Sequence, residues 1–134
     1  MHVCRGNWSK REEVLLAGDY RPLLPAFEAM NVQQFVLEYA TPRAGEIAVV
    51  GERLGDREIG LGVVNPRTDT PEPVADIVAR AEAALEFFSP ERIFLNPDCG
   101  FGCFANRCVN DAETAFRKMA HIAEAAGILR ARHG

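Results

Sequence analysis

The chain has 134 residues, of which 48% are hydrophobic and 25% are charged, and its formal net charge is −4. This composition is that of a globular domain and excludes a disordered tail. Lys and Arg are scattered among acidic residues, and no run approaches the roughly 20 apolar residues that cross a bilayer, so neither nucleic acid nor a membrane is expected as a partner. The first residues do not resemble an export signal, which favours a cytoplasmic protein.

Strands and helices are predicted to alternate along the first half of the chain. The apolar run Phe35-Val36-Leu37-Glu38-Tyr39 is typical of a strand that is buried on both faces of a parallel sheet. The full set of predicted elements in this half is a strand ending at 2–4, helices at 14–16, 20–30 and 46–54, and strands at 35–39 and 58–64.

The second half continues the same alternation. Apolar residues recur at three- and four-residue steps over 71–88, which predicts an amphipathic helix, and a strand is expected at 92–95. A loop over 96–110 carries three cysteines, and a final helix is predicted to begin at the capping pair Asn110 and Glu113. The predicted buried face of that helix contains Phe116, Met119, Ile122, Ala126 and Leu129.

Four strands alternating with helices indicate the α/β class, with parallel β/α units in a single domain over residues 1–134. Right-handed crossovers place every loop that follows a strand at the same edge of the sheet. Functional groups of parallel α/β folds gather at that edge. Side chains at the ends of the predicted strands are therefore expected to share one cleft.

Four residues at the predicted strand ends have the chemistry of metal ligands. His2 and Cys4 end the first strand, Glu38 lies near the end of the second, and Cys99 follows the fourth. An imidazole, two thiolates and a carboxylate suit zinc. Each has an alternative that does not involve a metal. His2 and Cys4 would belong to an N-terminus that binds no metal, Cys99 would be a small apolar side chain in the interior, and the Glu38 carboxylate would pair with an arginine such as Arg43.

Several segments resemble the C-terminal catalytic domain of cobalamin-independent methionine synthase over nearly the whole chain. They are His2-Val-Cys4, Leu37-Glu38, Glu58-Ile-Gly-Leu-Gly-Val-Val64 and Asn96-Pro-Asp-Cys-Gly100, of which the last is the most specific. The resemblance implies the C-terminal half of a TIM (β/α)8 barrel, approximately strands 5 to 8. It also implies zinc held by the residues matching His2, Cys4, Glu38 and Cys99.

The family transfers a methyl group from methyltetrahydrofolate to homocysteine, and the resemblance implies this activity here. In the family's methionine synthases a proton-donating histidine follows the third of these strands, whereas this chain has Arg67, which does not donate protons at neutral pH. An alternative is alkyl transfer to another thiol, such as coenzyme M. A further alternative is a noncatalytic truncated or split-barrel fragment, and half a barrel predicts a complementary half-barrel chain or self-association.

The remaining candidate residues are assigned weaker roles. Cys103 and Cys108 lack a fourth nearby ligand for a separate zinc knuckle, and no role is assigned to His121 or His133. Trp8 is expected to line a pocket or to serve packing. The polar residues for which contact with an anionic substrate and simple exposure to solvent both remain open are Arg5, Asn7 and Arg107.

Overall fold

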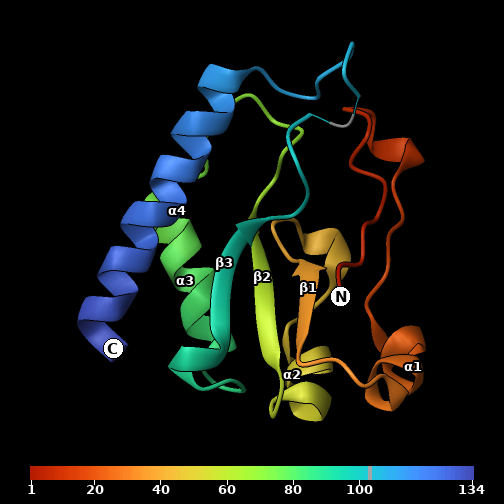
Figure 1. Ribbon diagram of the computed structural model, residues 1–134, viewed down its shortest axis with the longest axis vertical. Coiled ribbons are helices and arrows are strands. Elements are labelled where there is room, and N and C mark those ends of the chain that lie inside the picture. The colour runs from red at the N-terminus through yellow and green to blue at the C-terminus, as the bar shows by residue number, and fades with distance from the viewer. Residues whose placement is uncertain (103) are drawn as a thin grey trace.

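Three parallel strands form the centre of the structure, a computed structural model that describes residues 1–102 and 104–134. The strands β1 (Gln34–Glu38), β2 (Glu58–Val64) and β3 (Ile93–Pro97) are hydrogen-bonded in the order β1-β2-β3. Both pairs are parallel, and the register aligns Leu37, Leu61 and Leu95 across the sheet. The predicted parallel β/α units are therefore confirmed (Figure 1).

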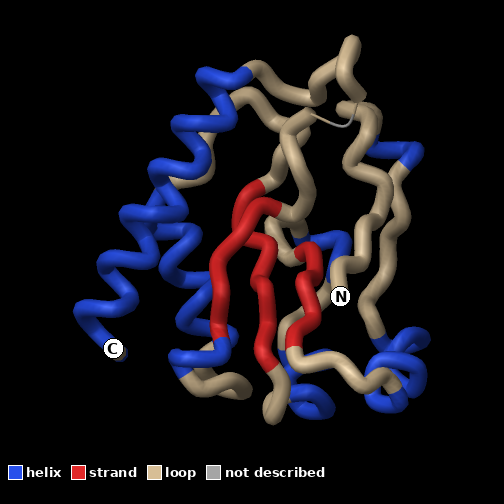
Figure 2. Tube along the Cα trace, in the orientation of Figure 1, coloured by secondary structure: helices blue, strands red, loops and turns tan. Residues whose placement is uncertain are grey.

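Four α-helices accompany the sheet, namely α1 (Leu24–Ala29), α2 (Ala48–Leu54), α3 (Val74–Ala84) and α4 (Ala112–His133). Figure 1 shows α3 and α4 side by side next to β3, whereas α1 lies at the opposite flank. The loops that follow β2 and β3 rise together above the carboxyl ends of the strands, as Figure 2 shows. Among the described residues, no helix combines the length and the apolar character needed to cross a membrane.

The N-terminal segment differs from the sequence-based expectation. The strand predicted at 2–4 is reduced to a single parallel bridge between His2 and Val36, supported by a hydrogen bond from Val3 N to Val36 O at 3.1 Å. The helix predicted at 14–16 is wrong, because a short 3₁₀ turn at Glu12–Val14 ends in an extended residue. This segment instead starts beside β1 and passes its carboxyl end, where the amide of Arg5 donates to Glu38.

One face of the sheet packs against the helices to form the hydrophobic core. Phe35, Leu37, Ile59, Leu61 and Val63 alternate with residues of the opposite face and are at most 1% exposed. Six of the seven β2 residues are buried, which explains why its sequence is a continuous run of apolar residues and glycines. Such a strand is stabilised mainly by apolar area removed from water.

Helix α4 begins and packs differently from its prediction. Its N-cap is Asp111, whose side chain accepts a hydrogen bond from Thr114 N at 2.6 Å, so the expected capping role of Asn110 is wrong. Ile122 is buried, but Phe116 is 76% exposed and Met119 is 44% exposed. The apolar periodicity identified a face of the helix, and only part of that face is covered in this chain.

A buried lysine holds the loop that follows β2. Lys118 is 0% exposed, and its Nζ donates to Asn65 O, Thr70 O and the Glu72 carboxylate at 3.1, 2.8 and 3.0 Å. The ammonium therefore has its hydrogen bonds satisfied inside the protein, as a buried charge requires. This arrangement fixes the loop at the carboxyl edge that carries Arg67.

Lys118→Met is expected to lower the free energy of unfolding by about 3 kcal/mol, because it leaves a mostly buried Glu72 carboxylate without its cation. Urea denaturation measures this loss. The control is Lys10→Met, since Lys10 and its partner Asp69 are both exposed and the change should cost less than about 1 kcal/mol. Equal losses in the two variants would contradict the structural role of Lys118.

Candidate metal centre

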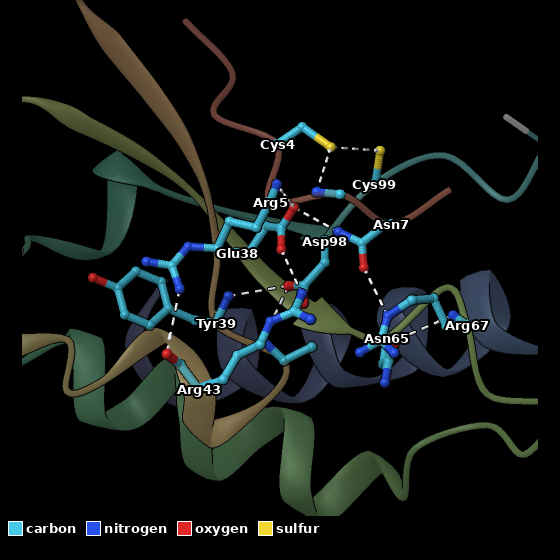
Figure 3. A network of polar contacts seen from close by, with 12 residues as sticks. Cys4, Arg5, Asn7, Glu38, Tyr39, Arg43, Asn65, Arg67, Asp98 and Cys99 are labelled. Atoms are coloured by element: carbon cyan, nitrogen blue, oxygen red, sulfur yellow. Dashed lines mark hydrogen bonds and ion pairs between the residues drawn. The ribbon is translucent and has the colours of Figure 1, made fainter. Parts of the chain in front are cut away.

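Three of the four predicted ligands lie together at the carboxyl edge of the sheet. One ligand atom from each of His2, Cys4 and Cys99 lies within 4.8 Å of the others. The sulfurs of Cys4 and Cys99 are 3.8 Å apart although 95 positions separate them in sequence. The bridge between His2 and Val36 positions the first two of these residues beside β1, and Cys99 follows β3. Figure 3 shows the sulfurs of Cys4 and Cys99 side by side.

The separation of the two sulfurs fits a shared zinc ion. A disulfide would place them about 2.05 Å apart, so 3.8 Å excludes a covalent bond. Two thiolates that each lie about 2.3 Å from a tetrahedral zinc are separated by roughly 3.8 Å, from simple tetrahedral geometry. The donor set of one imidazole and two sulfurs is also one that zinc prefers. The residues present therefore fit this metal.

Local hydrogen bonds orient the ligands. Nδ1 of His2 lies 3.2 Å from Val36 O, and a carbonyl only accepts, so this contact places the proton on Nδ1 and leaves Nε2 unprotonated, as a metal ligand would need to be. The amide of Gly6 donates to Sγ of Cys4 at 3.4 Å. Gly6 has a positive φ of 101°, which a residue with a side chain adopts only with strain.

The carboxylate of Glu38 lies in the same network but is held by the protein. It is 1% exposed, and its Oε1 accepts from Arg5 N at 2.8 Å and from Asn7 Nδ2 at 2.5 Å. Its Oε2 pairs with Arg43 Nη2 at 2.9 Å. The alternative of a buried carboxylate paired with Arg43 is thus present in the structure, while the metal-ligating role of Glu38 stays a prediction.

Tyr20 holds the backbone of the same residue. Its hydroxyl accepts from Glu38 N at 2.9 Å and donates to Glu38 O at 3.2 Å. Burial raises the pKa of Tyr20 to about 12, so the hydroxyl stays protonated. The guanidinium of Arg5 stacks over the Tyr20 ring at 4.4 Å from its centroid. Arg5 is buried, so its side chain packs on Tyr20 and is not a solvent-exposed polar group.

A second buried carboxylate ties the end of β3 to the end of β1. Oδ1 of Asp98 accepts from Tyr39 N and Ala40 N, both at 3.0 Å, and the residue is 1% exposed. A Cβ atom on Gly62 would lie only 2.2 Å from that oxygen. Glycine is therefore required at position 62 of β2, because any side chain would displace the residue that precedes Cys99.

Arg67 holds the N-terminal segment in place through its side chain. It is 4% exposed, and its Nε donates to Asn7 Oδ1 at 3.0 Å while Nη1 pairs with Glu12. Asn7 therefore connects Arg67 to Glu38, and both Asn7 and Arg67 lie in the interior. These contacts fix the N-terminal segment, which is a structural role that the sequence did not indicate.

The other candidate residues lie apart from this network. Cys108 is exposed, and Cys103 lies outside the described residues. His121 contacts Glu72 O at 2.7 Å, and His133 lies near Glu82 at the end of α4. Trp8 is 45% exposed. Arg107 stacks over Phe104.

Sequence reasoning missed Asp98, Tyr20 and the structural use of Asn7. One signal was available, since Asp98 lies in the motif Asn96-Pro-Asp-Cys-Gly100 and faces Gly62 of the Gly-Leu-Gly segment. A carboxylate beside a candidate metal-ligating cysteine, together with a glycine on the neighbouring strand, indicates a close approach of the two strands. Tyr20 offered no comparable signal.

Fold and site together define a class: a parallel β/α protein with a cluster of histidine and cysteine side chains at the carboxyl edge of its sheet. The profile of the family described as "Cobalamin-independent synthase, Catalytic domain" matches residues 11–125. The chain belongs to this family. The resemblance seen in the sequence motifs is therefore confirmed.

Curated relatives agree with this assignment. A methionine synthase of Thermococcus kodakarensis is 31% identical over 133 residues, which cover 97% of this chain and 33% of that protein. A methionine synthase of Sulfurisphaera tokodaii is also 31% identical over 133 residues, with coverages of 97% and 32%. The chain thus spans about one third of the length of these relatives.

A solved structure shares the fold. The B12-independent methionine synthase from Shewanella sp. W3-18-1, determined in complex with selenomethionine, superposes with a TM-score of 0.80. The match covers 98% of this chain and 38% of that one at 17% sequence identity. At this identity the likeness establishes the arrangement of strands and helices.

Asp98 gives a prediction on pH. Burial raises its pKa to about 7, whereas in an unfolded chain the carboxyl titrates near 4. Between these values the folded protein retains a proton that the unfolded chain has released, so stability should fall as the pH rises through this window. From pH 5 to pH 8 we expect Asp98 to contribute a loss of roughly 2 kcal/mol.

Asp98→Asn keeps the accepting Oδ1 and removes the charge, so urea denaturation of this variant should show a correspondingly smaller loss between pH 5 and pH 8. Asp98→Ala serves as the comparison, because it leaves the amides of Tyr39 and Ala40 without an acceptor and should destabilise at both pH values. An unchanged pH dependence in Asp98→Asn would show that the charge of Asp98 has no such effect.

Proposed function

We propose that this chain is the zinc-binding half of a methyltransferase that transfers a methyl group from methyltetrahydrofolate to the thiol of homocysteine. The observation that carries the proposal is the convergence of His2, Cys4 and Cys99 at the carboxyl edge. Membership of the cobalamin-independent synthase family and relatives described as methionine synthases support it. The proposed architecture is the C-terminal half of a (β/α)8 barrel.

In the proposed activity, some residues of this chain bind the metal and others position the segments that carry the ligands. His2, Cys4 and Cys99 would hold zinc, with Glu38 as a weak fourth ligand. When bound, the metal supplies Lewis acidity that favours the thiolate form of an incoming thiol near neutral pH. The Glu38 and Asp98 networks keep the ligand-bearing segments in register before substrate arrives.

A specific observation favours a second candidate, in which another thiol such as coenzyme M is the acceptor. Arg67 stands where the resemblance places a proton-donating histidine, and its guanidinium is committed to Asn7 and Glu12. Arginine cannot deliver a proton at neutral pH. Methyl transfer to homocysteine would then need a proton from water or from another group, and assays of several thiols with one methyl donor separate the two candidates.

The metal assignment is tested by occupancy. Purified protein should contain about one zinc ion per chain, and Cys99→Ser should lower occupancy strongly because it removes one of the three clustered ligands. Cys108→Ser is the matched control, since Cys108 is exposed and outside the cluster. Cys103→Ser should likewise retain the metal. Atomic emission on dialysed samples measures the occupancy, and equal retention in the Cys99 and Cys108 variants would refute the site.

The proposal includes a complementary half-barrel that covers the open side of the sheet. Within the described residues β3 has no strand on its outer edge, and a groove of about 900 Å³ lies between it and α4. Leu85, Phe94, Met119 and Leu129 are among the residues that line this groove. A strand added to β3 would satisfy its backbone groups and cover these apolar side chains.

Met119→Glu is therefore expected to weaken association with a polypeptide carrying the part of the Thermococcus kodakarensis relative that this chain does not match, by at least about tenfold, because it places a charge in the groove. Leu16→Glu is the control, since Leu16 is 69% exposed and does not line the groove. Sedimentation velocity measures both association and self-association. A concentration-dependent homodimer would show that a second copy covers the groove instead, and equal binding by both variants would exclude this surface.

A further inference from the structure

The carboxylate of Glu38 has two competing partners in the proposed metal centre. It lies next to the ligand-bearing segment, because its Oε1 accepts from the amide of Arg5, the residue after Cys4, at 2.8 Å. Its other oxygen pairs with Arg43 at 2.9 Å. Figure 3 shows Arg43 approaching Glu38 from the side away from the sulfurs of Cys4 and Cys99.

We propose that Arg43 is a positioning residue that competes with the metal for the Glu38 carboxylate, so that Glu38 binds the metal only weakly and a substrate thiol can take the fourth coordination position. This inference rests on the proposed function, because it assigns a role at the same site. It adds a residue that neither the ligand motif nor the family resemblance indicates.

The geometry of the ion pair supports this role. Oε1 of Glu38 already accepts two hydrogen bonds, from Arg5 N and Asn7 Nδ2, so Oε2 is the oxygen left for a metal or for Arg43. The Glu38 side chain is 1% exposed and that of Arg43 is 12% exposed, so water screens the pair weakly. A guanidinium and a divalent cation that seek one oxygen compete directly.

Arg43 is well placed to act on Glu38. It lies in the short 3₁₀ turn Pro42–Ala44 that follows β1, and its carbonyl accepts from Gly18 N at 3.0 Å and Arg5 Nη1 at 3.3 Å. Among the described residues, Nε and Nη1 of Arg43 have no hydrogen-bond partner. The backbone is thus anchored by other contacts, while the described hydrogen bond of the guanidinium goes to Glu38.

The proposal predicts opposite changes in two affinities. In Arg43→Met, Oε2 of Glu38 is released to the metal, so zinc should bind more tightly and homocysteine should bind the zinc-loaded protein about tenfold more weakly. Competition with a chromophoric chelator measures zinc affinity. The visible absorption of the cobalt-substituted protein, titrated with homocysteine, reports thiol binding without reference to turnover.

A double-mutant cycle separates this role from a structural one. In Glu38→Gln the carboxylate charge is absent, so adding Arg43→Met should no longer weaken thiol binding. Arg43→Lys keeps the cation and should resemble the wild type more closely than Arg43→Met does. Arg57→Met is the matched control, since Arg57 is a half-buried arginine that donates to the carbonyls of Met30 and Val32 near the amino end of β2.

The outcomes distinguish this inference from the proposed function. If the wild-type chain binds no zinc, the metal centre itself is wrong. If the wild type binds zinc and homocysteine but Arg43→Met leaves both affinities unchanged, only the role of Arg43 is overturned. Parallel weakening of zinc and thiol binding in Arg43→Met, or the same loss in the Glu38→Gln background, would also overturn it, because either result indicates general disruption of the site.

Discussion

The buried carboxylate of Glu38 is the interaction on which the geometry of the candidate metal centre depends. A carboxylate that is 1% exposed needs partners, and Glu38 finds them in the amide of Arg5, the side chain of Asn7 and the guanidinium of Arg43. Two of these partners belong to the N-terminal segment. Cys4 precedes Arg5 directly, so the requirement to satisfy a buried charge also fixes the position of a proposed metal ligand.

Asp98 is a second buried carboxylate whose hydrogen bonds fix a cysteine-bearing segment. Its carboxylate accepts from the amides of Tyr39 and Ala40, just beyond β1, and it precedes Cys99. Glu38 at the end of β1 and the two residues that follow it therefore anchor both cysteine-bearing segments. Burial raises the pKa of Asp98, and repulsion from Glu38 adds a smaller contribution in the same direction, so the two carboxylates are coupled electrostatically as well as through the backbone.

The sequence predicted the strands and the location of the site better than the contacts within it. Apolar runs identified β1 and β2, and the rule that parallel strands end at one edge brought His2, Cys4 and Cys99 together. The partner of Glu38 was not predictable in this way, because metal ligation and pairing with Arg43 place the same residue in the same strand. Only side-chain geometry distinguishes them, and spacing does not encode it.

The exposed side of α4 shows a second limit of prediction from the sequence. Periodicity identified Phe116 and Met119 as apolar positions of the final helix, but it does not say which element covers them. In the described part of the chain Phe116 stays 76% exposed and Met119 stays 44% exposed. Expectations of burial therefore failed at the α4 surface while they held for Ile122, which packs on the chain's own core.

The cluster of candidate metal ligands and the open groove beside β3 have different physical requirements. The clustered ligand atoms all come from this chain, and buried hydrogen bonds within the chain hold the segments that carry them. His2 and Cys4 are nevertheless exposed, and β3 ends the sheet with an open groove beside it. In the proposed activity, metal affinity would then depend on the local network, whereas exclusion of water from a reacting thiol would depend on the protein surface that covers the site. Binding of the metal and enclosure of the substrate are therefore separable steps in the proposed activity.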